Sequence, residues 1–158
     1  MKNKRIAIAV LSIVVALTVL FIFSNSLKSR EESAKDSTLI AKAIGPILEW
    51  LCGCSIENVG HVVRKLAHFS EFCVLGLATA GLVLVIDARR AWWLAGYSLL
   101  FCLFVAVCDE FIQGFIGRGS AVGDVLIDFS GAVFGSFLVI FIHLLVKSKK
   151  TKNKSHNN

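Results

Sequence analysis

The sequence predicts an all-α, polytopic membrane protein with four transmembrane helices. Of its 158 residues, 56% are hydrophobic, and the mean hydropathy of +0.73 is too high for a soluble domain of this length. Four apolar runs each approach the roughly 17–25 residues that a helix needs to cross the hydrocarbon core. These runs are 6–23, 66–86, 91–108 and 125–146. Transmembrane strands would instead show alternating segments of about ten residues, which the sequence lacks.

The net charge of +6 is distributed unevenly along the chain. Ten of the seventeen basic residues flank the spans on one side, namely Lys2, Lys4, Arg5, Arg89, Arg90, Lys147, Lys149, Lys150, Lys152 and Lys154. The positive-inside rule therefore predicts a cell-membrane protein with both termini cytoplasmic. Segments 24–60 and 109–124 then face outward. The basic residues are explained as a topology signal, and no feature indicates a nucleic-acid partner.

The first span and the segment that follows it form the next two elements. The run 6–23 is longer than the apolar core of about 7–15 residues in a signal peptide, so we expect an uncleaved anchor. Apolar residues then recur at helical spacing: Ile40, Ile44, Ile47, Leu48 and Leu51. They predict an amphipathic helix at the outer interface, with Trp50 at headgroup depth, although Pro46 would kink it. An ordinary packed loop is the alternative. Cys52 and Cys54 are spaced for a strained ring and have no assigned role.

The remaining spans have polar residues at helical spacing near their outer ends. The stripes are Arg64, His68 and Glu71 on the second span, Asp109 and Gln113 on the third, and Asp124, Asp128, Gly131 and Gly135 on the fourth. Asp128 would be costly in lipid, so we expect these faces to point into the bundle. Gly131 and Gly135 form a GxxxG motif, which allows close approach of a neighbouring helix or self-association of two copies.

Together these faces predict a cluster of charges at one depth. Its members are Arg64, Lys65 and Arg118, against Glu71, Asp109, Glu110, Asp124 and Asp128. The excess of carboxylates can be relieved by protonation or by a bound cation. Structural pairing is the alternative: Arg118 with Asp124, Glu71 with Arg64 or His68, and Lys65 as an interface anchor. Convergence of so many ionisable groups favours a binding or catalytic role.

Metal binding has only weak support from these residues. His68-x-x-Glu71 reverses the order of the paired Glu-x-x-His motifs found in di-metal bundles. Asp109, Glu110 and Asp124 would add oxygen ligands, but no second histidine motif accompanies them. We therefore assign neither a metal site nor a cofactor from the sequence.

Four spaced motifs occur in order along the chain. They are Phe23-Ser24-Asn25-Ser26, Arg64-Lys65-x2-His68-Phe69-x-Glu71-Phe72, Asp109-Glu110-x2-Gln113, and Arg118-x5-Asp124-x3-Asp128-x2-Gly131. The set resembles the VanZ-like family of small integral membrane proteins over nearly the whole chain except the tail. The family's namesake is associated with resistance to the glycopeptide antibiotic teicoplanin, so the resemblance implies a role at the cell envelope. Phe72, Asp128 and Gly117 depart from the tyrosine, asparagine and proline that are common in the family.

These observations predict one VanZ-like domain over residues 1–146 and a basic cytoplasmic tail over 147–158, which we expect to be disordered. We expect an outward-facing polar pocket that binds membrane lipid or a lipid-linked envelope precursor. The predicted ligand-binding residues are Arg64, His68, Glu71, Asp109, Glu110, Gln113, Arg118, Asp124 and Asp128. In this pocket Arg64 and Arg118 would hold a phosphate or carboxylate.

Two other functions are compatible with the same residues. A membrane hydrolase or transferase would use His68 with Glu71 or Asp109 as general acid and base on lipid-linked substrates. A non-catalytic membrane scaffold would depend on Gly131 and Gly135 instead. The sequence does not decide whether the protein is an enzyme.

Overall fold

The chain folds as a bundle of long helices without strands in the part that is described. The computed structural model describes residues 2–29, 31–36, 38, 40, 42, 50, 56–88 and 91–156. The long helices are α1 (Lys2–Ser26), α3 (Ile56–Asp87), α4 (Ala91–Phe115) and α5 (Val122–His156). The segments long and apolar enough to cross a membrane are Lys2–Ser26, Val59–Asp87, Trp93–Phe115 and Val122–Lys149. The predicted all-α architecture with four spanning helices is therefore confirmed.

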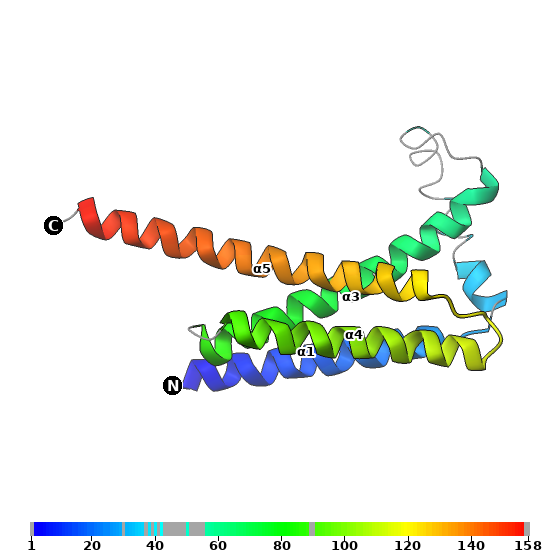
Figure 1. The fold of residues 1–158 in the computed structure, drawn as a ribbon, viewed down its shortest axis with the longest axis horizontal. Coiled ribbons are helices and arrows are strands. Elements are labelled where there is room, and N and C mark those ends of the chain that lie inside the picture. Colours follow the sequence, from blue (N-terminus) through cyan, green and yellow to red (C-terminus); the bar gives the residue numbers. More distant parts are fainter. Residues whose placement is uncertain are drawn as a thin grey trace.

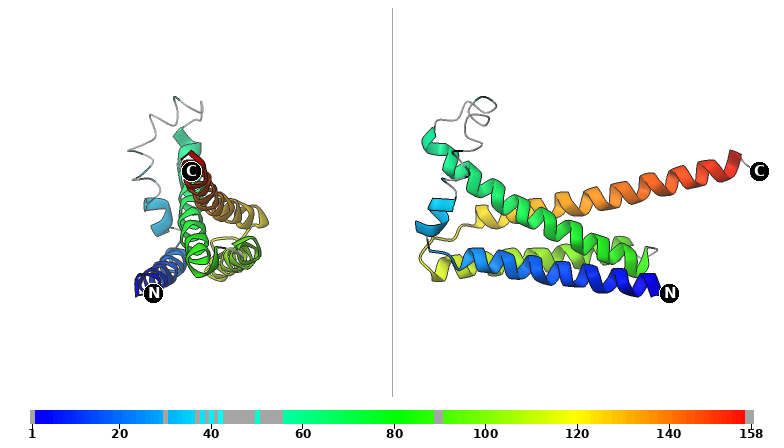
Figure 2. Two further views of the ribbon diagram at one scale, coloured as in Figure 1. Left: turned by 90° about the vertical axis from the view of Figure 1, so that its left-hand side faces the viewer. Right: turned by 180° about the vertical axis from the view of Figure 1, so that it is seen from behind.

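α3 is the central helix of the bundle, since it makes the most extensive contacts with the other helices, above all with α5. α1 and α4 run beside each other, whereas α3 runs obliquely to both and crosses α5 at an angle (Figures 1 and 2). Both chain termini lie at one end of the bundle (Figure 1). The chain segment after α1 and the link between α4 and α5 lie at the other end, which we call the distal end.

The apolar core is small and lies where all four helices meet. Its fully enclosed side chains come from α1 (Ile22), α3 (Phe72, Leu75), α4 (Cys102, Val105, Ala106) and α5 (Ala132). Most other large apolar side chains point outward; Leu17 and Leu20 on α1 are 60% and 64% exposed. Such outward surfaces suit lipid tails, which are as apolar as leucine.

Glycines make the crossing of α3 and α5 close. A Cβ atom added at Gly76, Gly131 or Gly135 would overlap the backbone carbonyl of Ala132, Phe69 or Cys73 respectively on the opposite helix. Ser136 Oγ also donates a hydrogen bond to the Gly76 carbonyl, at 3.3 Å. Small residues at a membrane helix interface allow backbones to approach in this way. The face of α5 that carries Gly131 and Gly135 therefore contacts α3 within this chain. The sequence alone had allowed either this contact or self-association of two copies of the chain.

The helices extend further than the apolar runs that predicted them. α4 continues to Phe115, so Asp109, Glu110 and Gln113 lie within its last turns. Their polar side chains are tolerated there because they are buried against other helices. α5 likewise continues to His156, beyond the apolar run that ends at residue 146, and the expected disorder of the tail stays a prediction. Lysine is a good helix former, so a lysine-rich segment can prolong a helix.

A short helical segment at residues 31–36 follows α1. It begins with a capping box, in which the Ser29 N–H donates to Glu32 Oε2 at 2.9 Å and the Glu32 N–H donates to Ser29 Oγ at 3.2 Å. The hydrogen bonds from Ser29 lower the pKa of Glu32 from its usual value. The amphipathic helix expected around residues 44–51, with its Pro46 kink, and the Cys52 and Cys54 pair lie outside the described residues.

Candidate functional site

Three ionisable side chains from three helices meet inside the bundle near its distal end. His68 Nδ1 on α3 lies 3.4 Å from Asp128 Oδ1 on α5 and 3.6 Å from Asp109 Oδ2 on α4. Both aspartates are completely buried, whereas the His68 side chain remains 18% exposed. We call these three residues the buried triad. One potential ligand atom from each lies within 4.8 Å of the other two.

The two aspartates of the triad differ in their partners. Asp109 accepts hydrogen bonds from Ser26 Oγ at its Oδ1 and from Gln113 Nε2, at 2.8 Å, at its Oδ2. Among the described residues, no hydrogen bond reaches either carboxylate oxygen of Asp128 or Nδ1 of His68. Burying a charged carboxylate without such partners is costly. The triad therefore needs a proton or a cation to balance it.

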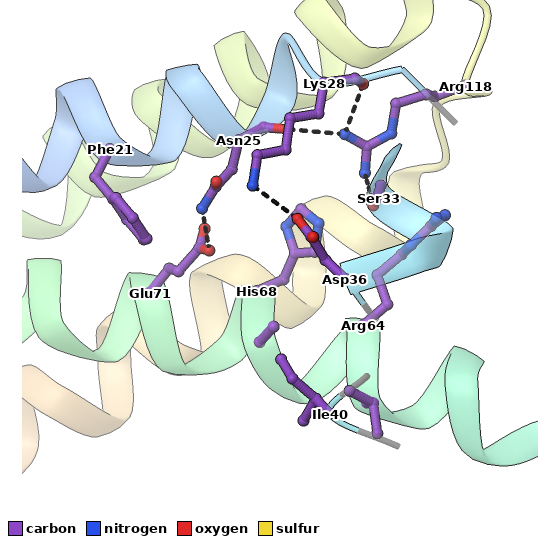
Figure 3. A pocket seen from close by; sticks show the side chains of 12 residues that line it. Phe21, Asn25, Lys28, Ser33, Asp36, Ile40, Arg64, His68, Glu71 and Arg118 are labelled. Atoms are coloured by element: carbon purple, nitrogen blue, oxygen red, sulfur yellow. Dashed lines mark hydrogen bonds and ion pairs between the residues drawn. The ribbon is translucent and has the colours of Figure 1, made fainter. Parts of the chain in front are cut away.

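A pocket of about 410 Å³ opens beside the triad, between the end of α1, the 31–36 segment and α3. Its apolar wall consists of Phe21, Ile40, Val63 and Ala67, and its polar lining consists of Asn25, Lys28, Ser33, Asp36, Arg64, His68, Glu71 and Arg118. Figure 3 shows Asn25 facing Glu71, Lys28 facing Asp36 and Arg118 facing Ser33. We call this space the larger pocket.

Most polar groups of the larger pocket are already paired. Asn25 Nδ2 donates to Glu71 Oε1 at 2.8 Å, and Lys28 Nζ lies 2.8 Å from Asp36 Oδ2 (Figure 3). Glu71 is therefore held by Asn25, instead of the Arg64 or His68 that structural pairing would have required. Arg64, by contrast, forms no hydrogen bond or ion pair with the described part of the chain. Its guanidinium therefore lines the pocket without a partner among the described residues.

A smaller pocket of about 190 Å³ lies next to the first. It shares Arg64, His68 and Arg118 with the larger pocket and adds His61, Lys65, Gln113, Gly119, Asp124 and Ile127. Lys65 Nζ lies 3.6 Å from Asp124 Oδ1, and both side chains are about 40% exposed (42% and 40%). Asp124 thus lies nearest Lys65, which corrects the alternative that Arg118 pairs with it.

Arg118 binds backbone groups at the end of α1. Its Nη1 donates to the carbonyl oxygens of Asn25, Ser26 and Lys28 at 3.0, 3.5 and 3.5 Å. Its Nη2 donates to Ser33 Oγ at 3.2 Å (Figure 3). The last carbonyls of a helix lack partners within it, and a cation there is favoured by the helix dipole. Burial lowers the pKa of Arg118, with nearby Arg64 acting in the same direction, but a guanidinium stays protonated.

The link that presents Arg118 has its own supports. Gly117 and Gly119 adopt positive φ angles of 75° and 83°, which residues with a side chain rarely adopt. Glu110 Oε2 accepts a hydrogen bond from the Ala121 N–H at 2.9 Å, which fixes the end of the link just before α5. Glu110 is therefore paired with this link and is absent from the lining of both pockets.

The predicted site residues are thus distributed over adjacent positions instead of one pocket. The larger pocket has Arg64, His68, Glu71 and Arg118; the smaller one adds Gln113 and Asp124; Asp109 and Asp128 lie behind His68; and Glu110 supports the link. Whether they bind a ligand stays a prediction. Sequence reasoning did not assign Asn25, Ser26 or Ser33 to the site. The polar run that ends the first apolar span was the available signal.

Comparison with known proteins identifies a family. A family model described as VanZ/LLP1 matches residues 8–144, which is most of the chain. No curated protein and no solved structure matches.

Proposed function

The chain belongs to the VanZ family, and from this premise we propose that it is a multi-pass cell-membrane protein whose larger pocket binds a lipid or a lipid-linked envelope precursor. In this proposal both termini are cytoplasmic and the distal end faces outward, in accord with the basic residues near the termini. The four apolar helices support the membrane location.

The observation that most supports this function is Arg64 beside an apolar wall. Phe21, Val63 and Ala67 offer an apolar surface to an acyl or prenyl chain, and Arg64 offers an anionic headgroup a guanidinium that has no partner among the described residues. The pocket lies at the end of the spanning segment of α1, which suits headgroup depth. Its volume of about 410 Å³ lies within the range of about 300–1,000 Å³ that is common for small-molecule sites.

The two arginines have different roles in this proposal. Arg118 is 7% exposed, and its donors are directed to the end of α1 and to Ser33. It therefore maintains the pocket wall, and phosphate or carboxylate binding falls mainly to Arg64. Arginine suits either group because its planar fork matches two oxygen atoms at once.

The link to glycopeptide antibiotics follows from this ligand class. A protein that retains a lipid-linked envelope precursor changes the amount displayed at the cell surface. Teicoplanin susceptibility would then change without any chemical modification of the drug. This part of the proposal rests on the association of the family's namesake with teicoplanin.

Binding by purified protein in nanodiscs tests the proposal. A polyprenyl phosphate and the corresponding uncharged polyprenol are the two probes. Arg64→Gln should weaken phosphate binding about 10- to 100-fold, as expected for losing a charged hydrogen bond worth about 1.5–3 kcal/mol, and should leave polyprenol binding unchanged. Arg5→Gln, at the opposite end of α1, is the matched control. Equal affinity of the wild-type protein for both probes, or an unchanged affinity in Arg64→Gln, would contradict the proposal.

A second candidate function, an enzyme acting on lipid-linked phosphates, is favoured by the position of His68. Its ring reaches both pockets, while Asp109 and Asp128 lie behind it, as carboxylates do behind a histidine that transfers protons. Release of inorganic phosphate from a polyprenyl diphosphate by wild-type protein, abolished in His68→Gln, would establish it. Tight binding without turnover would exclude it for that substrate.

A further inference from the structure

The strongest chemical feature beyond the lipid pocket is the buried triad. We propose that His68, Asp109 and Asp128 form a binding site for one divalent transition-metal ion of the Zn²⁺ or Mn²⁺ class. This inference does not depend on the proposed lipid ligand. Of the ligands considered from sequence it keeps His68 and Asp109 and adds Asp128, because Glu71, Glu110 and Asp124 are paired elsewhere with Asn25, the Ala121 N–H and Lys65.

The spacing of the three side chains fits a single ion. Two ligand atoms that are each about 2.0–2.1 Å from a zinc ion lie about 3.3 Å apart at the tetrahedral angle. His68 Nδ1 lies 3.4 Å from an oxygen of Asp128 and 3.6 Å from an oxygen of Asp109. With one ligand atom from each residue within 4.8 Å of the others, modest side-chain rotation would bring all three atoms to the ion and leave a fourth position for a water molecule or another ligand.

The partners missing around Asp128 point independently to a ligand. This side chain is 0% exposed, and neither of its oxygens accepts a hydrogen bond from the described residues. His68 Nδ1 is likewise buried without a hydrogen bond among them. A divalent cation would occupy these atoms together. Two carboxylates and one neutral imidazole would also balance its charge, which removes the cost of two buried negative charges.

The surroundings of Asp109 resemble the outer shell of a metal site. Ser26 donates a hydrogen bond to Oδ1 of Asp109, and Gln113 donates one to Oδ2. Together they fix the orientation of the carboxylate. Ligating carboxylates in metalloproteins are commonly held by such outer hydrogen bonds. Ser26 comes from α1 and Gln113 from α4, the helix that carries Asp109, so two helices hold the Asp109 carboxylate in place.

The donor set indicates which ions would bind. An imidazole nitrogen with carboxylate oxygens suits borderline transition metals, whereas Ca²⁺ and Mg²⁺ favour sites made of oxygen atoms only. His68 is also the member of the triad that lines both pockets. A metal ion at Nδ1 would occupy the lone pair of that nitrogen, so this nitrogen would not serve as a general base.

Metal binding by the full chain tests the site. The protein is purified in detergent with an affinity tag that lacks histidine, stripped with a chelator and dialysed against Zn²⁺ or Mn²⁺ alone. Wild-type protein should bind one equivalent. His68→Gln and Asp128→Asn should lower the affinity about 100-fold or more, beyond the 10- to 100-fold that loss of an outer-shell partner causes. His143→Gln, which removes a histidine of α5 that is not part of the triad, should bind as wild type does.

A measurement on the wild type alone covers the case in which a variant fails to fold. X-ray absorption of the zinc-loaded protein should show nitrogen and oxygen at about 2.0–2.1 Å with imidazole scattering, and no sulfur at about 2.3 Å. The proposal is overturned by absence of binding in the wild type, by a sulfur ligand, or by unchanged binding in folded Asp128→Asn. Absence of metal together with a protonated His68 would show that a proton balances the triad. Because the probe is the metal alone, these outcomes are separable from failure of lipid binding.

Discussion

Replacing Gly135 by alanine would place a methyl group against the backbone of α3. The added Cβ would overlap the Cys73 carbonyl oxygen and approach the Leu77 nitrogen to 3.0 Å. Backbone atoms inside a helix cannot rotate away as a side-chain terminus can. The two helices must therefore separate locally at this crossing.

The change in the free energy of unfolding of Gly135→Ala follows from two opposing effects. Alanine is favoured over glycine in a soluble helix by about 1 kcal/mol, whereas overpacking a close contact costs about 1–3 kcal/mol. With rigid backbone atoms on the opposite helix, the cost should lie at the upper end of that range. We expect a net loss of about 2 kcal/mol in the free energy of unfolding.

Unfolding in detergent micelles with increasing dodecyl sulfate measures this loss. Gly96→Ala is the matched control, since a Cβ atom at this α4 position would meet nothing within 4 Å. That control should be neutral or more stable by about 0.5–1 kcal/mol. Equal stability changes in Gly135→Ala and Gly96→Ala would refute the close-crossing argument.

Further perturbations address the distal end. Arg118→Lys should destabilise the protein by about 1.5–3 kcal/mol and expose the distal end to limited proteolysis, because one ammonium group cannot replace a guanidinium that reaches several carbonyls; wild-type resistance would argue against this role. Glu32 has a pKa below its usual 4.5, so its stabilisation of the capping box is present above that pH and is lost as the pH falls through the folded-state value. The Ser29 amide shift followed by NMR should report this transition, and Glu32→Gln should remove it. Gln113→Leu deprives Asp109 of a donor and should weaken Zn²⁺ binding about 10- to 100-fold in the dialysis assay, with an unchanged affinity counting against its outer-shell role.

The helical period predicted the faces of the site but not their depth or partners. His68 and Glu71 share a face of α3, as expected, yet His68 turns to the buried triad and Glu71 to Asn25 of α1. One helical turn separates the two residues. The difference arises because each meets a different neighbouring helix, and a sequence pattern does not specify which helix lies opposite each turn.

The role of Arg118 was also beyond the reach of sequence reasoning. A nearby carboxylate, Asp124, made an ion pair the simplest expectation. In the structure the guanidinium donates to the backbone carbonyls of Asn25, Ser26 and Lys28. These residues precede Arg118 by 93, 92 and 90 positions in the sequence. Backbone carbonyls have no signature in the amino-acid sequence, so such a contact leaves no motif to find.

The sequence by itself determined that four helices cross the membrane and which polar residues share a helix face. Span length and hydropathy depend only on the composition of each segment, and the helical period depends only on spacing. The tertiary structure alone decided that Asp109 and Asp128 converge on His68 and that Arg64 lines the larger pocket without a partner among the described residues. Those outcomes depend on the rotation and crossing of α3, α4 and α5, which are decided by close contacts such as Gly131 and Gly135 against the α3 backbone.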